Sequence, residues 1–137
     1  MNHRPVVVPG AVMVLSFEPP ARLLSMNDRD HHMRRSELVG LWRDAAYFYA
    51  CQLRPGGPSA RTLPEGRYRV ESVLPVEGRR RRDPMNFVAT VKAVVDGVTA
   101  AGVFPDDSEE FVTVAEPVLD VGGRLVTVAV VPARPHS

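Results

Sequence analysis

Lysine is nearly absent from this chain: Lys92 is the only one among 17 basic residues, and the rest are arginines. Cysteine is equally scarce. Cys51 stands alone, so no internal disulfide can form and a reducing compartment is indicated. No apolar run approaches the roughly 18 residues of a membrane-spanning helix, and the N-terminal apolar stretch is too short for a signal peptide. We therefore expect one cytoplasmic domain over residues 1–137, with no membrane partner and with frayed ends at about 1–5 and 132–137.

A solitary lysine in an arginine-rich chain is a candidate for a specific chemical role. Lysine is a compact ammonium on a flexible stem, which suits a point-charge contact to a phosphate or to an activated water. Charge is also uneven along the chain: residues 1–70 carry ten Arg and six acids, whereas residues 105–137 carry two Arg and six acids. A basic side facing an acidic patch suits a polyanion that is held by arginines and cut at a metal site, although the same numbers fit an ordinary protein surface.

Alternation of apolar and polar residues predicts four strands. A hairpin is expected at the C-terminal end, because Gly122–Gly123 separates two alternating runs. The expected strands span 11–17, 68–76, 111–118 and 124–131.

Helical periodicity predicts two helices between these strands. The first is expected to run from Ser36, as its N-cap, to about Leu53. The second opens with Asp83 as the N-cap and Pro84 at the first helical position, and Gly102 closes it. The order β-α-β-α-β-β predicts an α/β protein of the α+β type with one small mixed sheet.

Four acidic residues flank Lys92 in the sequence: Asp83 before it, Asp96 one helical turn after it, and Asp106–Asp107 in the following loop. Carboxylate oxygens from separate elements are ligands that Mg²⁺ accepts, with water and phosphate completing the octahedron. Such an ion activates water and neutralises charge developing on a phosphodiester. Lys92 would then stabilise that charge or orient the nucleophile.

Each of these residues also has a structural explanation, which the pattern alone leaves open. Asp83 ahead of Pro84 is a good helix cap. Lys92 and Asp96 are spaced as an exposed helix pair, worth only about 0.3–0.5 kcal/mol. The Asp106-Asp107-Ser108 sequence is typical of a turn.

Several motifs in the same order favour the functional explanation. From Arg79 the chain reads Arg-Arg-Arg-Arg-Asp-Pro-Met-Asn, and from Lys92 it reads Lys-Ala-Val-Val-Asp-Gly-Val-Thr-Ala-Ala-Gly-Val-Phe-Pro-Asp-Asp. Gly-Gly-Arg-Leu follows before the last strand. These motifs resemble the RusA-type Holliday junction resolvases, small phage and prophage endonucleases with a basic run into Asp-x-Asp-Asn, a Lys-x-x-x-Asp helix, Ala-Gly and an Asp-Asp turn. The resemblance covers about 50 residues, from Arg79 to Val128, and is looser around Asn27–His32.

The resemblance implies roles for individual residues. Asp83 and Asp107 match catalytic metal ligands of the family, with Asp106 as a further candidate. Lys92 matches the lysine needed for cleavage. Asn86 matches the Asn that closes Asp-x-Asp-Asn, and Asp96 closes the Lys-x-x-x-Asp motif as a supporting residue. The implied cofactor is Mg²⁺, with Mn²⁺ as an alternative, and no small-molecule cofactor is expected.

Met85 departs from the family pattern, because it stands where the family has its second catalytic Asp. A thioether is a poor ligand for a hard cation. The stretch from Asn86 to Lys92 is also about three residues longer than the shortest family pattern. Three explanations remain: fewer protein ligands with more water, impaired cleavage with binding retained, or substitution by another acid, the candidates being Asp106, Glu109, Glu110 and Glu71.

Arginines would hold the DNA backbone, since phosphate contacts position a duplex without reading its sequence. The alternative for the four-arginine run is a solvated surface, and His31–His32 lack the further ligands of a zinc site. The expected DNA-binding residues are Arg79, Arg80, Arg81, Arg82, Arg29, Arg34, Arg35 and Asn27.

The expected function is therefore a Mg²⁺-dependent endodeoxyribonuclease that resolves four-way junctions and related branched DNA in recombination and repair. The resemblance implies an intertwined homodimer, whose two-fold symmetry offers one site to each of two equivalent strands. The aromatic residues of the first helix are expected to serve core and dimer packing rather than base stacking: Trp42, Tyr47, Phe48 and Tyr49. The alternative is a branched-DNA-binding protein of the same fold whose cleavage is weakened by Met85.

Overall fold

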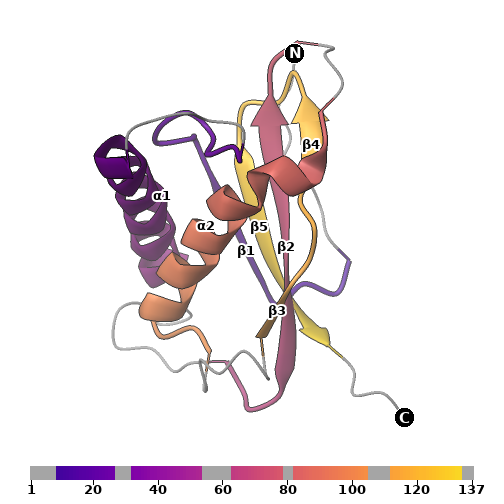
Figure 1. The fold of residues 1–137 in the computed structure, drawn as a ribbon. Coiled ribbons are helices and arrows are strands. Elements are labelled where there is room, and N and C mark those ends of the chain that lie inside the picture. Colours follow the sequence, from indigo (N-terminus) through magenta and orange to yellow (C-terminus); the bar gives the residue numbers. More distant parts are fainter. Residues whose placement is uncertain (1–8, 27–31, 54–62, 79–81, 105–111, 134–137) are drawn as a thin grey trace.

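Two helices pack against one face of a single mixed sheet (Figure 1). The structure is a computed structural model, and it describes residues 9–26, 32–53, 63–78, 82–104 and 112–133. The predicted α/β class with a small mixed sheet and two helices is confirmed. No helix among the described residues is long and apolar enough to cross a membrane.

The sheet is built around β2, which pairs with strands on both of its edges. On one edge β2 runs antiparallel to β5, which in turn pairs with β1. On the other edge β3 and β4 follow one another and run parallel to β2. The strands are β1 (Met13–Phe17), β2 (Arg67–Val76), β3 (Val112–Val114), β4 (Val118–Val121) and β5 (Val126–Ala133).

The predicted C-terminal hairpin is wrong. Gly122 does turn the chain, with a φ of 79° and its N–H bonded to the carbonyl of Val76 at 2.9 Å. However, the turn carries the chain across the end of β2, so β4 and β5 lie on opposite edges of that strand. A Gly-Gly turn indicates that the chain reverses, but it does not indicate which strand each flanking run pairs with. Here both flanking runs, β4 and β5, pair with β2.

The expected third strand is interrupted rather than continuous. It forms β3 and the start of β4, with Ala115, Glu116 and Pro117 between them. Pro117 has no N–H to donate to a strand ladder, which explains a break at that point. At the C-terminus the expected frayed region begins too early, because Pro132 and Ala133 belong to β5 and pair with β2.

The first helix, α1 (His32–Leu53), ends where expected but begins four residues before Ser36. Ser36 is therefore inside the helix and is not its N-cap. The helix is held by a buried stripe at four-residue spacing, which continues from its middle to its end: Leu38, Trp42, Ala46 and Ala50.

The second helical segment is capped as predicted and has a bend that was not predicted. Asp83 caps a short 3-10 helix, η2 (Pro84–Phe87), by accepting the Met85 N–H on Oδ1 at 3.0 Å. The α-helix α2 (Val88–Ala100) follows, and Gly102, with a φ of 77°, ends it. Phe87, with φ −106° and ψ 14°, is the joint between the two helices.

Candidate nuclease site

Lys92 lies on a groove between α2 and β3. The groove has a volume of about 660 Å³. The α2 residues that line it recur at helical spacing, so one face of α2 forms one wall of the groove. The opposite face of α2 is buried, with Thr90, Val91 and Val94 each at most 1% exposed. The lining residues are Val88, Lys92, Val95, Asp96 and Thr99 of α2 and Val112–Val114 of β3.

Lys92 and Asp96 share this groove, and both are exposed. Within the described ranges neither forms an ion pair, so the expected helix pair is not made. An exposed ammonium on a partly apolar wall, in no ion pair within the described residues, suits an anionic ligand. This is the arrangement expected for a phosphate-contacting lysine.

Asp83 is placed at the N-terminal end of the same helical segment. Its Oδ1 accepts the capping bond, and the side chain is exposed, so Oδ2 is open to solvent. The structural explanation for Asp83 is therefore confirmed, but capping uses only one carboxylate oxygen. The second oxygen leaves room for a cation.

Asp83 and Lys92 belong to the same helical segment but are not in contact. With rises of about 2.0 Å per residue in η2 and 1.5 Å in α2, they are roughly 15 Å apart along the axis of the segment. The Lys92 side chain leans toward the helix N-terminus, but Asp83 is not among the described residues that line its groove.

The third expected carboxylate is outside the described residues. Asp106 and Asp107, like Glu109 and Glu110, fall in the segment 105–111. In the part of the chain that is described, no three His, Cys, Asp or Glu side chains gather closely enough to hold a metal ion. The donor chemistry of Asp83 fits Mg²⁺, a hard cation that prefers oxygen.

Glu71 cannot replace the acid that is missing at Met85. Its strand neighbours Val70 and Ser72 are buried, and Val70 faces the helices. Side chains alternate along a strand, so Glu71 points to the other face of the sheet, where it pairs with Arg69 at 3.0 Å. Met85 itself is half-exposed beside Asp83. An acid at position 85 would therefore face solvent without disturbing the core.

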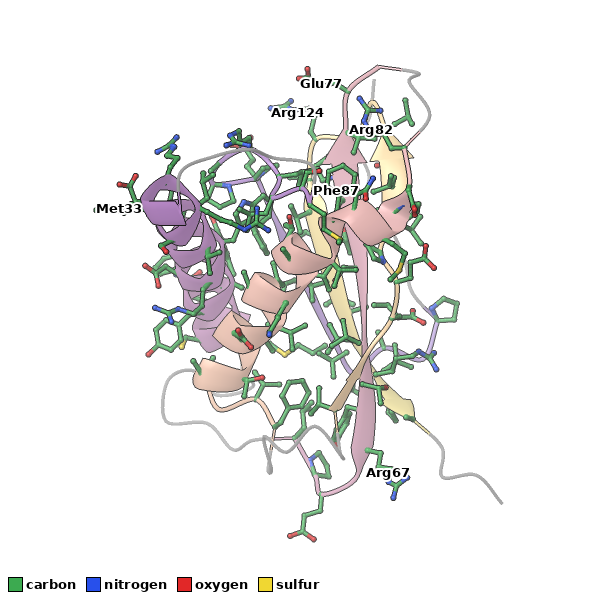
Figure 2. The ribbon with its side chains drawn as sticks, viewed as in Figure 1. Met33, Arg67, Glu77, Arg82, Phe87 and Arg124 are labelled. Carbon is green, nitrogen blue, oxygen red and sulfur yellow. The ribbon has the colours of Figure 1, made fainter. Side chains whose placement is uncertain are left out.

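A cluster of charged residues gathers at the end of the sheet next to η2. Figure 2 shows Glu77, Arg82 and Arg124 at this end, whereas Arg67 lies at the opposite end. Arg82 donates a hydrogen bond to the carbonyl of Glu77, and Arg124 pairs with Glu18 at 3.3 Å. Sequence reasoning missed Arg124. Its position just after the Gly-Gly turn was the available signal, because that turn brings it to the end of β2.

The other expected DNA-binding residues divide into two groups. Arg34 is exposed and pairs with Glu37 at 3.1 Å, and Arg35 donates to the carbonyl of Ser25 at 3.2 Å. Arg35 therefore has a structural contact. The remaining residues are outside the described part: Asn27, Arg29, Arg79, Arg80 and Arg81.

The aromatic residues of α1 have two different environments. Trp42 is fully buried, and Tyr49 stacks on Phe17 of β1 with ring centroids 5.2 Å apart. Core packing is confirmed for these two residues. Tyr47 and Phe48 are 47% and 54% exposed. Their role in a dimer stays a prediction.

Comparison with known proteins adds no assignment. No protein-family model matches the chain, and no curated protein matches it either. The function is therefore argued from the motifs and from the geometry of the groove.

Proposed function

We propose that this protein is a Mg²⁺-dependent, structure-selective endodeoxyribonuclease of the RusA type that acts on four-way junctions. The observation that carries the proposal is Lys92. It is the only lysine in the chain, and it forms no ion pair among the described residues; it lies on the groove face of α2, the helix that follows η2 with its Asp83 cap. The ordered motifs around it supply the reaction class.

Each side chain has a definite task in this proposal. Asp83, through Oδ2, and Asp107 bind the metal, with Asp106 as a further ligand. When bound, Mg²⁺ supplies an activated water and neutralises charge on the phosphodiester. Lys92 stabilises the negative charge that develops on the phosphate, and its ammonium is available for this because it forms no ion pair within the described residues. Asp96, one turn further along the same groove wall, is the supporting residue of the motif, although it forms no ion pair with Lys92 among the described residues.

The charged end of the sheet would hold the DNA backbone. Arg82 and Arg124 lie at this end, and Arg82 directly precedes Asp83 in the chain. Arginine contacts to phosphate fix the position of a duplex and carry no sequence information, so the branched shape would dominate recognition. A homodimer would present one such surface to each of two equivalent strands. We place this reaction in the cytoplasm, in recombination and repair.

The test is incubation of the pure protein with a synthetic four-way junction and Mg²⁺. We expect paired nicks in opposite strands and none in a linear duplex of the same sequence. The Asp107→Asn variant should bind the junction with equal or higher affinity and leave it uncut, because a negative charge near phosphate is removed. If the wild-type protein bound the junction without cutting it, the proposed nuclease activity would be refuted.

That outcome would favour the second candidate, a branched-DNA-binding protein on the same fold. The observation behind it is Met85, a thioether where the family has a carboxylate. Because Met85 is half-exposed and its side chain makes no hydrogen bond among the described residues, a carboxylate fits at this position.

The Met85→Asp substitution should raise the cleavage rate by about tenfold if the missing ligand limits catalysis. The reason is that a second carboxylate beside Asp83 would strengthen Mg²⁺ binding. The measurement is the single-turnover rate on the junction as a function of Mg²⁺ concentration. Met85→Asn, which adds a neutral polar group of the same size as Asp, is the control. An unchanged or lower rate in Met85→Asp would mean that the site is built around the absence of this ligand.

A further inference from the structure

The segment that leaves β1 is fastened to α2 by a buried hydroxyl group. Thr90 Oγ1 accepts the backbone N–H of Leu24 at 2.8 Å and donates to the carbonyl of the same residue at 2.9 Å. Both Thr90 and Leu24 are 0% exposed. A buried backbone N–H and C=O of irregular structure need partners, and here one side chain supplies both. Thr90 also lies two residues before Lys92.

A second contact fastens the same segment to η2. The N–H of Met26 donates to the carbonyl of Asn86 at 2.8 Å. Asn86 belongs to η2 and Thr90 to α2, while Phe87 between them has non-helical dihedral angles. The three-residue stretch Leu24–Met26 therefore crosses the joint, with one attachment on each side of it.

The stretch is itself held on its other side by α1. Arg35 donates to the carbonyl of Ser25 at 3.2 Å, and Trp42 donates through Nε1 to the carbonyl of Arg22, two residues before the stretch, at 3.0 Å. Trp42 is fully buried, so this side of the attachment is part of the core. Leu24–Met26 is thus hydrogen-bonded to α1, to η2 and to α2. We call this stretch the bracket.

We propose that Thr90 is a positioning residue: through the bracket Leu24–Met26 it fixes the angle between η2, which Asp83 caps, and α2, which carries Lys92. The inference rests on the proposed function and deepens it. The joint lies in the stretch between Asn86 and Lys92 that is longer than the shortest family pattern. With extra residues there, the relative placement of the two side chains is not set by one continuous helix, so a separate contact has to set it.

Thr90→Val tests this proposal, because valine keeps the shape of threonine and removes both hydrogen bonds. We expect the single-turnover cleavage rate to fall by about tenfold or more, as small displacements of catalytic groups are costly. Junction affinity should change by less than about twofold, since the arginine surface is untouched. Thr90→Ser keeps the hydroxyl and should restore most of the rate. A folded Thr90→Val protein that cuts at the wild-type rate would overturn the proposal.

Amide hydrogen exchange tests whether Thr90 holds the joint between η2 and α2, without any nuclease assay. Loosening the joint in Thr90→Val should speed exchange at Asn86 and Val88, whose N–H groups bond within the η2 segment, by about fivefold or more. Val130→Ala, a buried change in β5, is the control for general loss of stability. An increase no larger than in that control would show that Thr90 does not set the joint. If the wild type fails to cut DNA, the proposed function fails, while this exchange result still decides for or against the bracket.

Discussion

Replacing Gly97 by alanine should destabilise the fold by about 1–3 kcal/mol, although alanine is the better helix former. Gly97 is buried on α2 where that helix crosses α1. A Cβ atom there would lie 2.2 Å from the backbone oxygen of Arg43, 2.9 Å from the Cβ of Ala46 and 3.0 Å from the backbone nitrogen of Tyr47. The first of these is a backbone atom that cannot swing away, so the two helices would have to separate.

Gly40 provides the matched control. It also lies inside a helix, α1, but a Cβ atom there would meet nothing within 4 Å. Gly40→Ala should therefore stabilise the protein by roughly 0.5–1 kcal/mol, through helix propensity alone. Urea unfolding of both variants gives the comparison, with the midpoint moving down for Gly97→Ala and up for Gly40→Ala. A Gly97→Ala variant as stable as the wild type would show that the helices are not packed this closely.

Local signals in the sequence were enough to locate most elements. The Asp83-Pro84 start and the Gly102 end of the second helical segment depend only on neighbouring residues, and both are confirmed. Periodicity likewise located α1 through its buried stripe. Its start was misplaced by four residues because Ser36 is a good cap in isolation, and the choice of the first turn depends on contacts with distant segments.

Strand pairing depended on information that a local pattern does not contain. The Gly122–Gly123 turn was identified correctly, but its two flanking strands do not pair with each other. β2 lies between them, since it pairs with β4 on one edge and with β5 on the other. A sequence pattern gives the alternation of faces along a strand, but it does not give the order of strands in a sheet.

The candidate site was predictable only where it depends on residues close together in the sequence. The motif identified Asp83 and Lys92, and helical spacing correctly gave Lys92 and Asp96 a common face. The groove wall from β3 and the bracket at Leu24–Met26 were not predictable, because both depend on contacts between residues far apart in sequence. Thr90 in particular looks like an ordinary helix residue until its partner, 66 residues earlier, is known.

Lys92→Met should lower the single-turnover cleavage rate on a four-way junction by about 100–1,000-fold, the size of effect seen when one preorganised charge-stabilising group is removed. Methionine keeps the length and apolar body of the side chain, and Lys92 is exposed, so the fold should be unaffected. Junction affinity should fall by only a few fold, since one charge is lost and the arginines at the end of the sheet are retained. Lys92→Arg keeps the charge but replaces a compact ammonium with a planar fork, and we expect only partial recovery of the rate.

Arg67→Met is the control for loss of a positive charge. Arg67 is exposed on β2 at the end of the molecule opposite Arg82 (Figure 2), and strand alternation turns its side chain to the face of the sheet away from the helices, so its loss should affect neither cleavage nor junction affinity by more than about twofold. Rates and affinities of all three variants, measured at several salt concentrations, separate catalysis from binding, because a lost phosphate contact reduces the salt dependence of affinity. If Lys92→Met lost binding and cleavage equally, the groove would be a DNA-holding surface. Its unpaired lysine would then contact phosphate before the reaction and contribute nothing specific to the transition state.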